Sequence, residues 1–505
     1  MIYYPLVFLS GAAVLVIELL GTRVIAPYFG ATVYVWSALI TVTLAALAAG
    51  YAAGGVLADR PRPLLALGLV LGGASCWLFL LPVLQRPALA AVSGFGVRAG
   101  ALAAAGLLFG PPLAALGCVG PLCIRLRTKA LRRLGREVGA ISAVSTGGSV
   151  LGALATGFYL IPRVPTSAVL TGLAVLLALP AAWCIWRERA GGLGAVLLLA
   201  AAGAGRLCAP ETVADGKLRA RALSFYGDIL VVDRASWGRR YLYVNGIANT
   251  VVDLDTLDST SDYISALELT AFLRPEARRA LLVGLGGGAL VHRFRAHYGI
   301  VTDVVEVDPA MERVARRWFG FRPSGRTKIG DGRRWLMHGA ESYDFIVLDA
   351  FNGDQHPYHL FSLEAFAAAA ERLTADGVLA VNIIGYAHGP QGELRRAVER
   401  TLRRVFPHVR VLAANRDLDY QTEYVNLIFT ASRQPLVFRR DPALARPALA
   451  RYYAAVRDSY LPAAEAAGPP LTDELNPIES LSAPAFLAIR RRLLDGARDV
   501  LAYGI

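Results

Sequence analysis

The stretch LLVGLGGGALVHRF (281–294), followed by VTDVVEVDP (301–309), decides the fold of the C-terminal half. Glycines at 284 and 286–288 allow a tight turn after an apolar strand and leave no side chain over a ligand. Glu306 ends the next strand about 20 residues on, where a carboxylate accepts hydrogen bonds from both hydroxyls of a ribose. This pattern is typical of dinucleotide-binding and S-adenosyl-binding enzymes alike.

Strands and helices alternate around this loop. Two stretches with β-type alternation, 222–234 and 240–253, predict a small β-hairpin region with a turn at 236–238. Alternation beyond them predicts an α/β doubly wound, Rossmann-like domain of the methyltransferase type, which binds ligands at the carboxyl ends of its strands. The predicted elements are a helix at 261–273, strand 280–284, helix 287–297, strand 302–306, helix 309–318, strand 344–348, helix 362–374 and strand 378–383.

Two further acids follow predicted strands. Asp331 lies in GDGRRW (330–335), where it can hold an adenine amino group, and Asp349 lies in YDFIVLDAFNGD (343–354). Together with the glycine loop and Glu306, they predict a nucleoside pocket with one spare acid.

The N-terminal half is much more apolar. The 505-residue chain is 55% hydrophobic, and from 5 to 205 its charges lie almost only in short loops. We therefore expect a multi-pass α-helical membrane domain ahead of the α/β domain. The predicted spans are 5–27, 35–57, 64–84, 99–124, 138–161 and 166–186, and a seventh apolar run, 191–205, is short enough either to cross or to lie at the interface.

Charge sets the expected orientation. Arginines and lysines concentrate in the loops after the even-numbered spans, so the positive-inside rule places the N-terminus in the cytoplasm. Six spans would leave the second half in the cytoplasm, which we expect, and seven would place it outside. Much of the net charge of +13 lies in these loops, and no nucleic-acid-binding signature accompanies it, so we expect no nucleic-acid partner. The five cysteines imply neither disulfides nor a metal site.

A series of ordered motifs resembles the spermidine synthases, the polyamine aminopropyltransferases, and most closely their bacterial membrane-fused subgroup. The resemblance covers about 217–432. The motifs are SFYGDI, YVNGIANT, VGLGGG, VVEVD, GDG, YDFIVLDAFNGD, HLFSLEAF and DGVLAVN.

The resemblance implies aminopropyl transfer from decarboxylated S-adenosylmethionine, a co-substrate rather than a bound cofactor, to a putrescine-like amine. Asp349 would accept the proton of the attacking amine. Donor binding would fall to Gly284, Gly286, Gly288, Glu306, Asp331 and Gly332, and acceptor binding to Tyr226, Tyr263, Asn352, Asp354 and Tyr420.

The chain departs from the family pattern on the amine side. Gly287 stands where the glycine loop of the family carries an Asp that binds the aminopropyl ammonium. Gly227 and Asn382 replace glutamines, and Asn352 replaces a second Asp. Two alternatives therefore stay open: a methyltransferase that uses intact S-adenosylmethionine, and a non-catalytic transporter or sensor that binds a nucleoside or polyamine.

We expect three parts: a transmembrane domain at 1–206, a spermidine synthase-like domain at 217–435 and a helical tail at 436–505. The expected partners are a small amine and the lipid bilayer of the inner cell membrane, and a homo-oligomer stays open.

Overall fold

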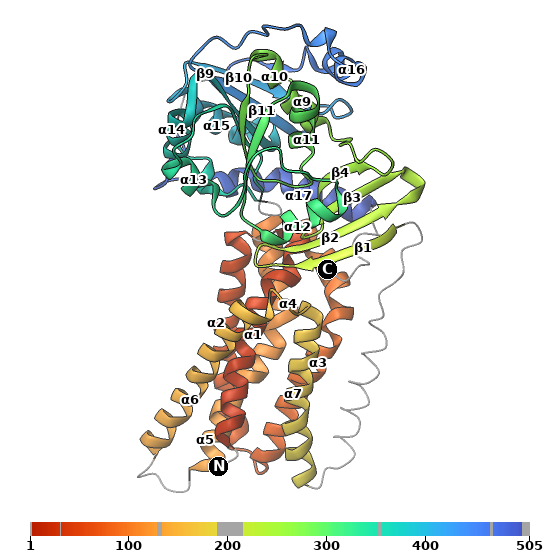
Figure 1. Ribbon diagram of the computed structural model, residues 1–505. Helices are drawn as coiled ribbons and strands as arrows, with labels where there is room; N and C mark the ends of the chain where they lie inside the picture. The colour runs from red at the N-terminus through yellow and green to blue at the C-terminus, as the bar shows by residue number, and fades with distance from the viewer. Residues whose placement is uncertain are drawn as a thin grey trace. The chain divides into compact units, whose positions relative to one another are not determined.

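The computed structural model describes residues 3–30, 32–128, 134–188, 216–351, 355–464 and 468–496. These residues form two compact units, one that ends at 188 and one that begins at 216 (Figure 1). Each unit is described by itself.

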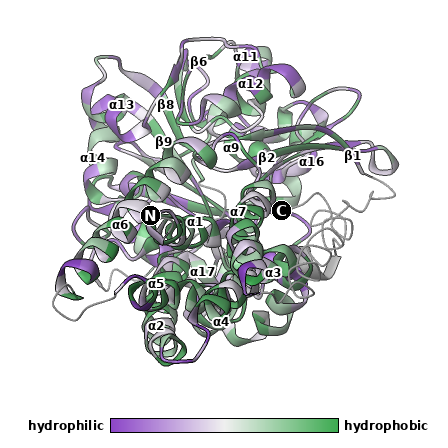
Figure 2. Ribbon diagram, turned by 90° about the horizontal axis from the view of Figure 1, so that it is seen from below, coloured by the Kyte–Doolittle hydropathy of each residue, from purple (hydrophilic) through white to green (hydrophobic). Residues whose placement is uncertain are grey.

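The first unit is a bundle of apolar helices, which Figure 2 shows mainly in green. Small residues allow the helices to approach closely: a Cβ on Gly148 would lie 2.1 Å from the carbonyl oxygen of Phe8, and one on Gly152 2.7 Å from that of Ala12. The helices are α1 (Tyr3–Phe29), α2 (Val33–Ala58), α3 (Pro63–Val92), η1 (Ser93–Phe95), α4 (Gly96–Gly117), α5 (Val119–Arg127), α6 (Leu134–Leu154), the π-helical turn η3 (Ala155–Leu160) and α7 (Thr166–Arg187).

Among the described residues, six helices are long and apolar enough to cross a membrane. They correspond to the six expected spans and cover Tyr3–Ala26, Val33–Ala58, Pro63–Val92, Arg98–Arg127, Leu134–Leu160 and Thr166–Arg187. The seventh expected segment, 191–205, lies outside the described residues.

The second unit begins with a four-stranded antiparallel sheet in the order β1-β2-β3-β4. Its strands are β1 (Gly216–Leu223), β2 (Asp228–Arg234), β3 (Arg239–Val244) and β4 (Ile247–Asp253), with η4 (Ala235–Trp237) between β2 and β3. The expectation of only two strands here is wrong. Asn245 and Gly246, with φ of 49° and 81°, form a two-residue turn that divides the second predicted strand into a hairpin.

The main sheet has eight strands in the order β12-β10-β11-β9-β8-β5-β6-β7. The five strands from β9 to β7 are parallel, whereas β11, β10 and β12 extend the sheet in antiparallel pairs. They are β5 (Arg279–Val283), β6 (Val301–Glu306), β7 (Thr327–Ile329), β8 (Tyr343–Leu348), β9 (Leu373–Tyr386), β10 (His408–Ala413), β11 (Tyr424–Ser432) and β12 (Tyr460–Leu461).

Helices cover both faces of this sheet, each over its own buried core. Helices α13, α14, α15 and α17 pack on one face, and α9, α10, α11, α12 and α16 on the other. Their bounds are α9 (Asp262–Glu268), α10 (Thr270–Leu273), α11 (Ala289–Tyr298), α12 (Pro309–Trp318), α13 (Gly332–His338), α14 (Leu363–Arg372), α15 (Glu393–Arg403), α16 (Pro447–Val456) and α17 (Ile478–Gly496), with the short helices η5 (Tyr358–Leu360), η6 (Pro390–Gly392) and η7 (Pro442–Leu444).

The expected fold class is confirmed: apolar helices precede a Rossmann-like α/β domain with a small β region. Three predicted boundaries were wrong. The helix predicted at 261–273 breaks at Leu269 into α9 and α10, and the helix predicted to start at 287 begins two residues later, after Gly288. The strand predicted at 378–383 extends to the whole of β9, because Leu373 already pairs with Tyr343 of β8.

The described residues beyond 436, at 437–464 and 468–496, belong to the same compact unit as the main sheet. Leu461 and Tyr460 of β12 pair with Val411 and Leu412 of β10, and Ile478 and Leu481 of α17 pack into the core under α14 and α15. The C-terminal segment therefore takes part in the fold of the unit and in both of its cores.

Candidate active site

The candidate site lies at the carboxyl ends of five neighbouring strands. The order β9-β8-β5-β6-β7 places side by side a residue from each strand or from the turn after it. Along this edge lie Asn382, Asp349, Gly284, Glu306 and Asp331. Ligands of doubly wound sheets bind at this edge, because the chain turns away from the sheet there and leaves a crevice.

Gly284 follows β5, which lies between the strands that lead to Asp349 and Glu306. It has a φ of +91°, and a Cβ there would lie 2.3 Å from the carbonyl oxygen of Asp349. Its N–H donates to the carbonyl oxygen of Val305 at 2.9 Å, and the N–H of Asp349 donates to that of Val283, also at 2.9 Å. Only glycine satisfies this backbone conformation and this close approach, so the ends of β8, β5 and β6 are fixed relative to one another.

Glu306 is 7% exposed, and backbone groups hold its carboxylate on both sides. One oxygen accepts from the N–H of Leu285 at 2.8 Å, and the other from the N–H of Asp308 at 2.9 Å. Burial raises the pKa of Glu306, while these backbone donors oppose the shift. The carboxylate is thus held in one orientation by backbone donors.

Asp331 lies at the open end of the site, at the N-terminus of α13. One of its oxygens accepts from the N–H of Arg334 at 2.8 Å, and the other lies 2.9 Å from Nε2 of His359. Gly332 follows within van der Waals range of β5, since a Cβ there would lie 2.3 Å from Cγ1 of Val283. The side chains of Asp331 and His359 are 44% and 38% exposed, so a ligand can reach both.

Asp349 is partly buried and has a side-chain donor. Nδ2 of Asn382 donates to Oδ1 of Asp349 at 2.8 Å, and Oδ1 of Asn382 accepts from Nδ2 of Asn426 at 3.1 Å. Burial raises the pKa of Asp349 to about 6, and the hydrogen bond from Asn382 opposes that shift. A carboxylate with this pKa is mostly ionised at neutral pH, yet it accepts a proton more readily than a solvated one.

Tyr263 and Thr250 border Asp349 and the glycine loop. Burial and then the charge of Asp349 raise the pKa of Tyr263 well above its usual value, and its hydroxyl donates to the carbonyl oxygen of Asn249 at 3.4 Å. Thr250 accepts a hydrogen bond from the N–H of Gly287 at 3.0 Å. A Cβ on Gly287 would lie 2.7 Å from Cγ2 of Thr250, so this methyl group occupies the space beside the loop.

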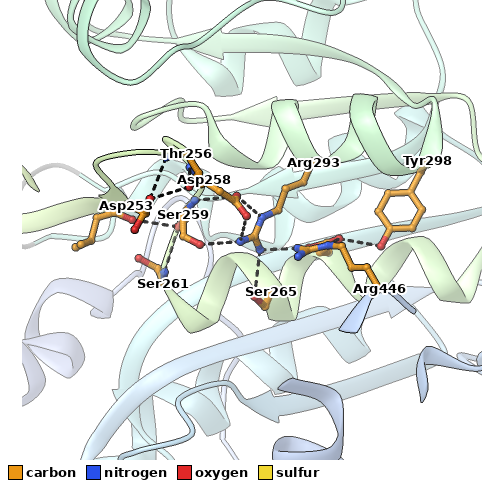
Figure 3. A network of polar contacts seen from close by, with 11 residues as sticks. Asp253, Thr256, Asp258, Ser259, Ser261, Ser265, Arg293, Tyr298 and Arg446 are labelled. Atoms are coloured by element: carbon orange, nitrogen blue, oxygen red, sulfur yellow. Dashed lines mark hydrogen bonds and ion pairs between the residues drawn. The ribbon is translucent and has the colours of Figure 1, made fainter. Parts of the chain in front are cut away.

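A buried ionic network fixes the segment that leads from β4 to Tyr263 (Figure 3). Arg293 of α11 is 3% exposed and binds both oxygens of Asp258, at 2.9 and 3.2 Å, and the carbonyl oxygen of Ser259 at 2.7 Å. It also lies 3.2 Å from Glu268, which is fully buried and receives Arg446 at 2.7 Å. The network therefore ties this segment to α11 and to the residue before α16.

Of the other four residues assigned to acceptor binding, Tyr226 and Tyr420 are described and Asn352 and Asp354 are not. Burial, followed by the charges of Asp308, Asp331 and Glu306, raises the pKa of Tyr226. The ring of Tyr420 lies 6.0 Å from that of His388, in the connection between β10 and β11. Asn352 and Asp354 lie outside the described residues. Acceptor binding by these four stays a prediction.

Sequence reasoning missed several residues at the site. Thr250, His359 and Asn426 reach it from distant parts of the chain, and their contacts to Gly287, Asp331 and Asn382 span 37, 28 and 44 residues. Thr250 ends the motif YVNGIANT and His359 begins the motif HLFSLEAF, but neither residue was assigned to the site, and Asn426 lies in no quoted motif.

Comparison with known proteins identifies relatives of the chain, although no family model matches it. It is 38% identical over 114 residues to a polyamine aminopropyltransferase of Vibrio vulnificus, covering 21% of this chain and 38% of that protein. The chain is thus similar to the polyamine aminopropyltransferases. It is also 29% identical over 170 residues to an N-terminal histidine N-methyltransferase of Emericella nidulans, covering 32% of this chain and 30% of the relative.

The chain spans about a third of the length of these curated relatives. Among solved structures, it is similar to that of a probable spermidine synthase from Corynebacterium glutamicum, at 19% identity and a TM-score of 0.39, covering 48% of this chain and 88% of the other. The resemblance of the sequence motifs to the polyamine aminopropyltransferases is confirmed by these curated relatives, and the membrane-fused subgroup stays a prediction.

Proposed function

We propose that the chain is a membrane-anchored aminopropyltransferase that uses decarboxylated S-adenosylmethionine and a putrescine-like amine. The observation that carries this proposal is the position of Asp349. It is a partly buried carboxylate at the end of β8, held by Asn382 and separated from Glu306 by one strand end. Asp349, the proposed proton acceptor, and Glu306, the proposed ribose-binding carboxylate, thus lie on either side of the same glycine turn.

In the proposed reaction, the amine nitrogen attacks the propyl carbon bound to the sulfonium. The C–N bond forms as the C–S bond breaks, and the electron pair leaves with sulfur in methylthioadenosine. The nitrogen loses one proton, which Asp349 accepts. Because the sulfonium is already an activated leaving group, alignment of the two reactants and removal of this proton are the main tasks of the protein.

A first experiment tests donor binding at Glu306. In Glu306→Gln, an amide N–H₂ would face one of the two backbone donors, Leu285 or Asp308, and the ribose would lose a charged acceptor. Binding of methylthioadenosine, measured by calorimetry, should weaken by about 1.5–3 kcal/mol. Glu371→Gln, at an exposed position of α14, is the control. Equal affinity of both variants would show that the nucleoside site lies elsewhere.

A second experiment tests transfer. Asp349→Asn should lower the rate of transfer by about 10²–10⁴-fold and leave methylthioadenosine binding intact, because the amide keeps its size but accepts no proton. Asp417→Asn, at an exposed position before β11, should behave as wild type. Activity of Asp349→Asn within a few-fold of wild type at saturating substrates would exclude Asp349 as the base.

A methyltransferase is the second candidate, and one observation favours it. Gly287 offers no carboxylate for an aminopropyl ammonium, and Thr250 fills the adjacent space. Incubation with each donor and mass spectrometry of the amine distinguishes an added aminopropyl group from an added methyl group. Binding of adenosyl ligands without either product would favour the non-catalytic sensor or transporter.

We further propose that the second unit faces the cytoplasm, where adenosyl donors are made. The described part of the first unit has six helices that are long and apolar enough to span a membrane, which supports an even number of crossings. Ala235→Cys introduces an exposed thiol beside Gly238 in a background with Cys76 and Cys208 replaced. An impermeant maleimide should label it only after cell lysis, and labelling of intact cells would place the unit outside.

A further inference from the structure

The segment from Leu471 to Asn476 lies against the loop that forms the open end of the nucleoside site. The carbonyl oxygen of Leu471 accepts from the N–H of Leu363 at 2.7 Å. Nδ2 of Asn476 donates to the carbonyl oxygens of Tyr358 and Phe361 at 3.0 and 3.2 Å. These contacts span more than a hundred residues of sequence and hold both ends of η5.

Asp473 makes the central contact of this segment. Its carboxylate accepts from Arg333 at 2.7 and 3.3 Å and from the hydroxyl of Ser362 at 2.5 Å. Arg333 in turn donates to the carbonyl oxygen of His359 at 2.9 Å. The guanidinium is only 12% exposed, so its direction depends on the carboxylate that it meets. Asp473 thereby fixes the backbone of His359.

His359 connects this chain of contacts to Asp331, the acid that is expected to bind the adenine of the donor. Nε2 of His359 lies 2.9 Å from Oδ2 of Asp331, while Oδ1 already accepts from the N–H of Arg334. An ionised carboxylate only accepts hydrogen bonds, so His359 donates from Nε2. The remaining lone pair of Oδ2 then has a fixed direction and is available to a further donor.

We propose that Asp473, acting through Arg333 and His359, is a positioning residue that sets the purine specificity of Asp331. The inference rests on the proposed function, because it assumes that Asp331 meets the base of the donor. An adenine 6-amino group donates a hydrogen bond to the carboxylate. The 6-oxygen of hypoxanthine is an acceptor, so it is repelled by the carboxylate oxygen. A carboxylate locked in place rejects the 6-oxo base more strongly than one free to turn into solvent.

Calorimetry with the full-length protein and two ligands, methylthioadenosine and its 6-oxo counterpart methylthioinosine, tests the proposal. The wild type should bind the 6-amino ligand more tightly by about tenfold or more. Asp473→Asn and His359→Ala should each lower this ratio to about two or less, whereas His359→Gln, which keeps an N–H donor, should retain much of it. Glu474→Gln, at the exposed neighbouring position, is the matched control and should leave the ratio unchanged.

The outcomes separate the two proposals. A wild type that binds neither ligand would contradict the proposed function. A wild type that binds and discriminates, together with unchanged ratios in both Asp473→Asn and His359→Ala, would overturn the inference alone. A loss of affinity for both ligands by the same factor in these variants would also overturn it, because a purely structural role lowers binding without changing the discrimination.

Discussion

Asn382 donates a hydrogen bond from Nδ2 to Oδ1 of Asp349 at 2.8 Å, from the strand adjacent to β8, which Asp349 follows. Asn382 is 1% exposed, and Asn426 on β11 fixes its amide in turn. The bond holds one oxygen of the carboxylate. It also favours the ionised form at a site where burial disfavours it, so two opposing effects set the pKa of Asp349.

We expect the pH dependence of transfer to follow Asp349. With a pKa of about 6, roughly nine-tenths of this carboxylate is ionised at pH 7. Since the base must be ionised, kcat/KM should fall about tenfold per pH unit below pH 6. Measurement of kcat/KM between pH 4.5 and 8, in a series of buffers of constant ionic strength, shows this decrease, which is the acid limb of the pH profile. An acid limb whose midpoint lies near the usual pKa of aspartate would contradict the assignment.

Asn382→Ala should move the acid limb to higher pH. The variant removes the donor that lowers the pKa of Asp349, while burial continues to raise it. Transfer at pH 6 should therefore decrease more than transfer at pH 8. Asn426→Ala keeps the bond between Asn382 and Asp349 and should shift the limb less. Equal decreases at both pH values would indicate a purely structural effect.

Asp349→Asn should stabilise the fold at neutral pH. Burial raises the pKa of Asp349 from 3.8 to about 6, so between these values the folded protein binds more protons at this side chain than the unfolded chain does. Stability therefore falls as the pH rises through this window, and the full loss is present above pH 6. Two pKa units would correspond to about 3 kcal/mol, which partial exposure reduces to about 1–2 kcal/mol.

Thermal unfolding of both proteins at pH 7 and pH 4 measures this effect. The variant should unfold at a higher temperature at pH 7, and the difference should shrink at pH 4. A variant less stable than the wild type at pH 7 would show that the ionised carboxylate stabilises the fold, and the raised pKa would then be wrong.

Arg293→Met should destabilise the protein strongly. It leaves fully buried Glu268 with Arg446 as its remaining cation and removes both ionic bonds to Asp258. Breaking a buried ion pair on one side costs about 3–5 kcal/mol. Arg316→Met breaks an exposed pair with Glu312 one turn away and should cost less than about 0.5 kcal/mol. Urea unfolding of the two variants compares these costs, and similar values would contradict a role for burial.

The strand-end part of the site could be predicted from local sequence. Gly284, Glu306 and Asp349 each follow an apolar run within a few residues, and the strand order places them together. The turn at Asn245, which separates β3 from β4, is also encoded by local sequence. It was not predicted, because the residues on both sides of it show the alternation of a single strand.

The contacts that orientate these acids could not be predicted. Asp473 and Arg333 are 140 residues apart, and the pairing of β11 with β9 brings Asn426 to Asn382. Exposed polar residues such as Asp473 carry no periodic signal, and no single sequence reveals which of many acids in the C-terminal segment meets an arginine. Such pairings follow from the fold rather than from any local pattern.

Gly287→Ala should destabilise the glycine loop for a steric reason alone. Its backbone does not have a positive φ, but the new Cβ would lie 2.7 Å from Cγ2 of Thr250. Overpacking of this kind costs about 1–3 kcal/mol. Thr250→Ser removes that methyl group and keeps the hydroxyl that accepts from the N–H of Gly287. The double variant should therefore recover most of the lost stability, with only the ring edge of Phe319 at 3.2 Å left to adjust.

Gly288→Ala is the control for this pair. Its φ is +80°, and a Cβ there would lie 2.5 Å from the ring of Phe321, so Thr250→Ser should not rescue it. Thermal unfolding and methylthioadenosine affinity of the three single variants and the two double variants measure both effects. If Thr250→Ser restores Gly287→Ala, an acidic side chain can be accommodated at 287 only when residue 250 also loses its methyl group. If it does not, Thr250 is not what keeps position 287 a glycine.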